Sequence, residues 1–173
     1  MGVKYAGLGL LMLLALICDY KIYRIKNAVV VPFIVAGILT NTVLGGPEGL
    51  KSSISGILLP VLLLIVFFAL RMLGAGDIKL FSAVGSIMGA EFVMYAMAYS
   101  FISGGVIAVL IIALRKNGKE RLRHLVAYIK SCFLSFSLLP YTDFEDKSDG
   151  AKFRFSYAIA CGTLIQIIAA FYL

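Results

Sequence analysis

Two aspartates stand out in this sequence as side chains whose positions could support catalysis. Asp19 ends an apolar run in the stretch ICDYKIYRIKN, and Asp77 follows another apolar run in the stretch GAGDIKL. Two carboxyl groups that meet in a partly dry site cannot easily both ionise, because their charges repel. One then keeps a proton while the other acts as a base. Such a pair can activate water against a peptide carbonyl and protonate the leaving amine.

Taken singly, each aspartate has a simpler interpretation. Asp77, with Gly74 and Gly76 before it, fits a helix end with a capping glycine and an exposed acid. Asp19 fits an interfacial acid that is balanced by Lys21 and Arg24. The catalytic hypothesis therefore depends on the two acids lying together.

The composition indicates the environment in which these acids lie. Of the 173 residues, 61% are hydrophobic and 14% are charged, and the mean hydropathy is +0.99. A soluble domain is about 45–50% apolar. We therefore predict an integral membrane protein with a single domain over residues 1–173. The first apolar run has no small-residue cleavage site, so we expect it to be retained as a helix.

Six apolar runs are candidates for membrane helices, since a span needs about 20 mostly apolar residues. They cover residues 4–19, 28–44, 53–73, 78–90, 92–114 and 154–172. We predict an all-α membrane protein, a polytopic bundle of about six transmembrane helices. The fourth run is short, and we expect it to extend into the GAGD stretch or to be buried in the bundle. The tight turn at Glu91 predicts that the fourth and fifth helices are antiparallel.

The distribution of basic residues predicts the orientation. With an external N-terminus, the segments 19–27, 71–79 and 115–154 are cytoplasmic, and they hold 14 of the 16 Lys and Arg residues. Cytoplasmic loops carry an excess of these residues. Both Asp19 and Asp77 then lie at the cytoplasmic face, because one ends an odd-numbered helix and the other follows one. The net charge of +7 arises from this bias and needs no nucleic-acid partner, although the same face would attract anionic lipid.

The last cytoplasmic loop contains its own helical pattern. Apolar residues recur at helical spacing in GKERLRHLVAYIKSCFLSF, residues 118–136, and the basic residues fall mostly off that stripe. We predict an amphipathic helix that lies in the inner interface. His124 belongs to this segment, and we interpret it as a solvated residue rather than a general base.

The cysteines give no sign of a metal or cofactor site. Cys18, Cys132 and Cys161 are far apart, and no CxxC pair occurs. A zinc site or a disulfide framework is not expected. We predict that the protein uses no metal and no cofactor.

The two aspartates, taken with their flanking residues, resemble the type IV prepilin peptidase family, membrane aspartyl proteases with a GxGD motif. In that family, a first Asp is followed by an element like Arg-Ile-Pro-Asn, which Asp19, Arg24, Ile25 and Asn27 match. The second motif is matched by the residues Gly74, Gly76, Asp77 and Lys79. The late stretch KFRFSYAIACGTL is also similar to the last helix of the family.

This sequence departs from the family pattern in two places. Lys26 replaces the usual proline, which affects the expected shape of the first loop but not the acid. The N-terminal insertion with paired CxxC motifs, which the bifunctional members use for N-methylation, is not seen. The chain therefore resembles the short, peptidase-only enzymes of tight-adherence (Flp) pilus systems. The presenilin-like GxGD proteases are a more distant comparison.

The resemblance implies an aspartyl endopeptidase of the prokaryotic cytoplasmic membrane. It would cut the short basic leader of a prepilin or pseudopilin after a glycine, at the cytoplasmic face. Asp19 and Asp77 would be catalytic, with Gly74, Gly76, Lys79, Arg24 and Asn27 supporting them or binding substrate. Lys79 has an equally good alternative, in which its side chain reaches out to lipid phosphate. A homo-oligomer is compatible with the sequence.

Two other functions remain to be compared with this one. A small ion- or proton-coupled transporter would use the same acids as an ion pathway. It would favour acids near mid-bilayer and two similar halves, and no internal repeat is present. A membrane assembly factor without enzymatic activity would tolerate the loss of either aspartate.

Overall fold

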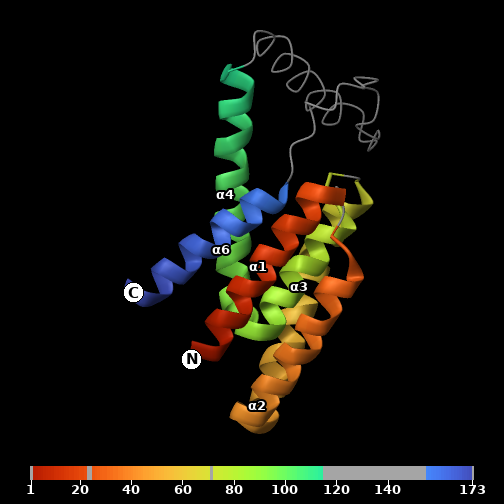
Figure 1. The fold of residues 1–173 in the computed structure, drawn as a ribbon, viewed down its shortest axis with the longest axis vertical. Coiled ribbons are helices and arrows are strands. Elements are labelled where there is room, and N and C mark those ends of the chain that lie inside the picture. The colour runs from red at the N-terminus through yellow and green to blue at the C-terminus, as the bar shows by residue number, and fades with distance from the viewer. Residues whose placement is uncertain (1, 23–24, 71, 115–154, 173) are drawn as a thin grey trace.

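The computed structural model describes residues 2–22, 25–70, 72–114 and 155–172 (Figure 1). The helices in these ranges are α1 (Gly2–Ile22), α2 (Asn27–Ala69), α3 (Ala75–Met88), α4 (Ala90–Leu114) and α6 (Phe155–Tyr172). The described residues contain no strand. The predicted all-α fold class is therefore confirmed for this part of the chain. The predicted amphipathic helix and His124 lie outside the described residues.

Helix α2 is a hairpin of two helical arms rather than one long rod. Its 43 residues include Gly46, whose backbone is non-helical with φ 57°. The Asn41 side chain donates a hydrogen bond of 2.8 Å to Ser53 Oγ, twelve residues later. On a straight helix these residues would be about 18 Å apart. Gly46 allows the reversal because it adopts a left-handed φ at no steric cost, and Pro47 follows it as a residue suited to starting a helix.

Four of the five described helices, α1, α2, α4 and α6, are long and apolar enough to cross a membrane. Large apolar side chains such as Leu62, Leu110 and Ile168 are more than half exposed on their surfaces. Such faces suit hydrocarbon rather than water. The protein is therefore a membrane protein. The predicted count of about six separate spans is not confirmed, since the second and third predicted runs are joined in α2 and the fourth forms a helix of only 14 residues.

Helix α3 lies at the centre of the packing. Every residue from Leu80 to Ile87 is buried, which is the pattern of a helix surrounded by others. It begins at Ala75, so it includes the GAGD acid, as the short apolar run suggested. Gly89, with φ 97°, then reverses the chain into α4.

Close contact between backbones fixes α3 against the α2 hairpin. A methyl group placed on Gly56 or on Gly85 would overlap the carbonyl oxygen of the other residue, and one on Gly37 would lie 2.6 Å from Ser86 Oγ. Small residues allow membrane helices to approach this closely. The glycines at these positions are thus packing residues. Gly105 is not, because no atom lies within 4 Å of the position its Cβ would take.

A polar cluster adds directional bonds at the end of the hairpin near Gly46. Asn41 Nδ2 donates to the backbone oxygens of Ser86, at 2.8 Å, and Ile87, at 3.1 Å, and Ser53 Oγ also donates to Ser86 O, at 2.8 Å. All these groups are buried, so an unpaired partner would be costly. The cluster holds the C-terminal end of α3 in register. Because α3 is a single helix, this register also fixes the position of its first turn, at the other end of the bundle.

Candidate active site

Asp19 and Asp77 lie at the same end of the bundle. Asp19 is in the last turn of α1, and Asp77 is in the first turn of α3. This end also carries the start of α6, whereas the chain termini and the turn at Gly46 lie toward the opposite end (Figure 1). Both aspartates are half-buried, and the charge of Asp19 reaches Asp77. The structure therefore places the two acids within range of each other's charge.

Asp77 has an unusual affinity for its proton. Burial raises the pKa of its carboxyl from 3.8 to about 6, and the negative charge of Asp19 acts in the same direction. The backbone N–H of Gly74 opposes both effects, because it donates a hydrogen bond to the carboxylate. A carboxyl group with a pKa in this range can exchange a proton near neutral pH.

Gly74 and Asp77 together form the start of α3. Gly74 is the N-cap residue, and the N–H of Asp77 donates to its carbonyl oxygen at 3.1 Å. The Asp77 side chain reaches back to the N–H of Gly74, which is half of a capping box. A Cβ on Gly74 would lie 3.2 Å from Asp77 Oδ2. Glycine at this position thus leaves room for the carboxylate.

The segment between α1 and α2 packs against the GAGD turn. A Cβ on Gly76 would contact the side chain of Ile25, at 3.4 Å, and Lys79 Nζ donates to Asn27 Oδ1 at 2.9 Å. The stretch that follows Asp19 and the stretch that contains Asp77 are therefore in direct contact. Arg24 lies outside the described residues.

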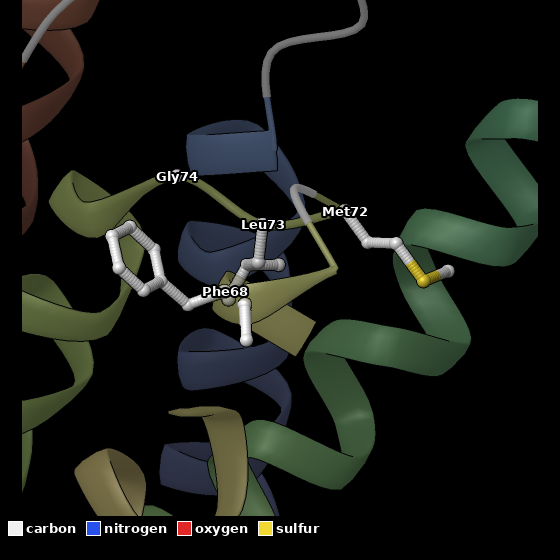
Figure 2. Close-up of a pocket in the computed structure, with 5 residues that line it drawn as sticks. Phe68, Met72, Leu73 and Gly74 are labelled. Atoms are coloured by element: carbon white, nitrogen blue, oxygen red, sulfur yellow. The ribbon is translucent and has the colours of Figure 1, made fainter. Parts of the chain in front are cut away.

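Beside Gly74 there is an open, largely apolar hollow of about 540 Å³. Phe68, Ala69, Met72, Leu73 and Gly74 line it. Figure 2 shows the side chains of Phe68, Leu73 and Met72 spread around the turn that leads to Gly74. Because Gly74 also contacts the Asp77 carboxylate, an apolar segment in this hollow would lie next to the acid.

Ser156 belongs to the stretch that is similar to the last helix of the family, but its contact with Asp19 was not predicted. Ser156, in the first turn of α6, donates a short hydrogen bond of 2.5 Å to Asp19 Oδ2. The two residues are 137 positions apart, and no periodicity or motif links them. Within the described ranges, no three His, Cys, Asp or Glu side chains are grouped as metal ligands would be.

Comparison with known protein families extends the description of this site. The model of the type IV leader peptidase family matches residues 6–109, more than half of the chain. The chain belongs to the type IV leader peptidase family. The match covers both aspartates and ends before α6. Searches of the curated proteins and of the solved structures each found no match.

Membership of the type IV leader peptidase family confirms the predicted family and identifies the chain as a peptidase of the leader-cleaving type. It also implies a prepilin-like substrate. Nothing in the family match or in the described residues favours the transporter hypothesis.

Proposed function

We propose that this type IV leader peptidase cuts its substrate by an aspartyl mechanism in which Asp19 and Asp77 form the catalytic pair. The observation that carries the proposal is that the two half-buried acids lie within range of each other's charge at one end of the bundle. Of the acids in the described residues, Glu48 lies beside the turn at Gly46 and Glu91 in the first turn of α4, both away from this end. Asp19 and Asp77 are therefore the acids of the described residues that lie together at this end of the bundle.

The chemistry needs one carboxylate and one protonated carboxyl group. The carboxylate takes a proton from water as the water oxygen attacks the peptide carbonyl carbon, and the other acid gives its proton to the carbonyl oxygen. The tetrahedral intermediate then collapses and the C–N bond breaks. The leaving amine takes the proton from the protonated acid, and one hydroxyl of the intermediate gives its proton to the ionised acid, which restores the starting state of the pair. The raised pKa of Asp77 suits it to hold a proton in such a cycle.

The surroundings of the pair support a substrate with a polar leader followed by an apolar helix. The hollow lined by Phe68, Met72 and Leu73 offers apolar surface next to Gly74, and the two acids offer negative charge for a basic leader. The distribution of Lys and Arg along the sequence favours the cytoplasmic side for the segments that hold Asp19 and Asp77. We thus propose cleavage of a prepilin-like leader at the cytoplasmic face.

The test is co-expression with a prepilin-like protein that has a short basic leader, a glycine at the cut and an apolar helix after it. We expect wild type to convert the substrate to a faster-migrating form, and Asp19→Asn and Asp77→Asn each to abolish the conversion while inserting at normal levels. Glu91→Gln is the matched control, since Glu91 also lies in the first turn of a helix but at the other end of the bundle. Normal processing by either aspartate variant would contradict the mechanism.

A further inference from the structure

The hydroxyl group of Ser156 donates to a carboxylate, whereas the other buried hydroxyls in the described residues donate to backbone oxygens. Ser86, Ser100 and Thr163 donate to backbone oxygens three or four residues earlier in their own helices. Ser156 lies in the first turn of α6. It is 2% exposed and donates instead to the Asp19 carboxylate of another helix. A buried hydroxyl directed at a candidate catalytic acid is more than a packing feature.

The location of Asp19 explains why it needs such a partner. Asp19 is in the last turn of α1, where the partial negative charge of the helix dipole disfavours an anion. The N-terminal turn of α6, which carries partial positive charge, meets it there with the Ser156 hydroxyl. Hydrogen bonds to a carboxylate are about twice as strong as those between neutral groups. Helix α6 thus supplies the stabilisation of the anion that α1 lacks.

We propose that Ser156 is a positioning residue. Its hydroxyl group holds Oδ2 of Asp19, and Asp19 is the carboxylate that takes the proton from water. This inference rests on the proposed function, and it deepens it by assigning the two acids different tasks. With Oδ2 occupied by Ser156, Oδ1 is the oxygen that faces the attacking water. Asp77 is then the acid that gives its proton to the carbonyl oxygen. Its raised pKa agrees with that assignment. The family match ends at residue 109, so Ser156 lies outside the matched pattern.

Few charged side chains occur in the described parts of the helices that pack against α1. Helix α1 packs against α2, α3 and α6. The described part of α6 has no Asp, Glu, Lys or Arg. In the described part of α2, the charged residues are Glu48 and Lys51, at the hairpin turn, and Lys26 precedes this helix. Helix α3 carries Asp77 and Lys79, and the end of α1 carries Lys21 as well as Asp19. Among these residues, Asp77 is the acid at the same end of the bundle as Asp19.

The experiment compares Ser156→Ala, Ser156→Thr and Ser100→Ala in the full-length protein, with cleavage kinetics on the prepilin-like substrate from pH 5 to 9. Losing a hydrogen bond to a charged group predicts a kcat about tenfold to a hundredfold lower for Ser156→Ala, with KM unchanged within about twofold. Ser156→Thr, which keeps the hydroxyl, should recover most of kcat. Ser100→Ala, which removes a buried hydroxyl bonded to Ala96 O in α4, should match wild type.

A second measurement does not depend on cleavage. The chain has five aspartates, so ¹³C labelling of their carboxyl carbons gives few signals. The carboxyl signal of Asp19 is identified as the one that disappears in Asp19→Asn. This signal should shift in Ser156→Ala and keep its position in Ser100→Ala. Wild-type kcat in Ser156→Ala, with Asp19→Asn inactive, would overturn the inference and leave the proposed function standing. An unshifted Asp19 signal in Ser156→Ala would overturn it as well. Wild-type protein that fails to cleave would instead contradict the proposed function.

Discussion

The ammonium group of Lys79 donates a hydrogen bond to the side-chain oxygen of Asn27, 2.9 Å away. Lys79 belongs to the first half of α3 and Asn27 begins α2, so the bond links the two segments that follow the candidate catalytic acids. Both side chains are exposed, which identifies the bond as a surface link rather than a buried ion pair. Lys79 was expected either to act on a carboxylate or substrate, or to extend to lipid, and the structure adds this third interaction.

This link predicts a coupled effect of Lys79 and Asn27 on activity. Lys79→Met and Asn27→Ala should each lower kcat a few-fold, because an exposed hydrogen bond of a charged group is worth about 1 kcal/mol. The kcat of the double variant should be no lower than that of the less active single variant, because each single substitution already removes the same bond. Cleavage kinetics of the four proteins measure this coupling. Fully additive losses would show that the two residues act independently.

Gly74→Ala should lower activity without unfolding the protein. The backbone of Gly74, with φ −78° and ψ 145°, is open to alanine, so no conformational strain is expected. The new methyl group would lie 3.2 Å from Asp77 Oδ2 and would displace the carboxylate. We expect kcat to fall about tenfold, as a small misplacement of a reacting group costs rate. Thermal unfolding in detergent should change little.

Gly9→Ala is the control for this substitution, because no atom lies within 4 Å of its Cβ position. It should retain wild-type activity. If Gly74→Ala cleaves at the wild-type rate, the carboxylate of Asp77 does not need the space that glycine leaves.

Much of the architecture followed from patterns along the chain. The apolar runs located the described helices, and the parity of those runs placed Asp19 and Asp77 at one end. The break between the second and third runs corresponds to Gly46, where glycine and proline reverse the chain. Such features have local causes, namely hydrophobic length and turn chemistry. They were therefore accessible without coordinates.

The contacts that refine the site had no local cause. Ser156 and Asp19 meet because α6 packs against α1, and Lys79 meets Asn27 because α3 packs against α2. A serine in an apolar helix more often bonds its own backbone, as Ser100 does. Only the tertiary arrangement distinguishes Ser156 from it. The short length of α3 was likewise understood only when its burial on all sides was known.

Gly85→Ala should destabilise the bundle and reduce activity together. Its methyl group would overlap the carbonyl oxygen of Gly56, so α3 must move away from the α2 hairpin. Overpacking of this kind costs about 1–3 kcal/mol, and more where backbone is displaced. Because α3 carries Asp77, the shift should also lower kcat. Thermal unfolding in detergent and cleavage kinetics measure the two effects.

Gly105→Ala serves as the comparison, since that position is open and lies within α4. Alanine favours a helix over glycine by about 1 kcal/mol, so this variant should be as stable as wild type or more stable. Equal stability of Gly85→Ala and Gly105→Ala would refute the close contact between α2 and α3.

Asp77→Asn should make the folded protein more stable at neutral pH while removing activity. Burial, with a contribution from the charge of Asp19, raises the pKa of Asp77 to about 6 from 3.8. Between those values the folded state holds more protons than the unfolded state, so the free energy of unfolding falls as pH rises. Asparagine stays neutral and can still accept the N–H of Gly74. The gain for Asp77→Asn should therefore be absent near pH 4 and reach at most about 3 kcal/mol above pH 6.

Unfolding in detergent from pH 4 to 8 measures this difference for wild type and Asp77→Asn. Glu91→Gln, the exposed acid in the first turn of α4, should follow the pH dependence of wild type. In Asp19→Asn the charge that helps to raise the pKa of Asp77 is gone, so the fall in stability should end at lower pH. A gap between wild type and Asp77→Asn that is the same at pH 4 and pH 8 would show that the ionisation of Asp77 does not depend on its burial.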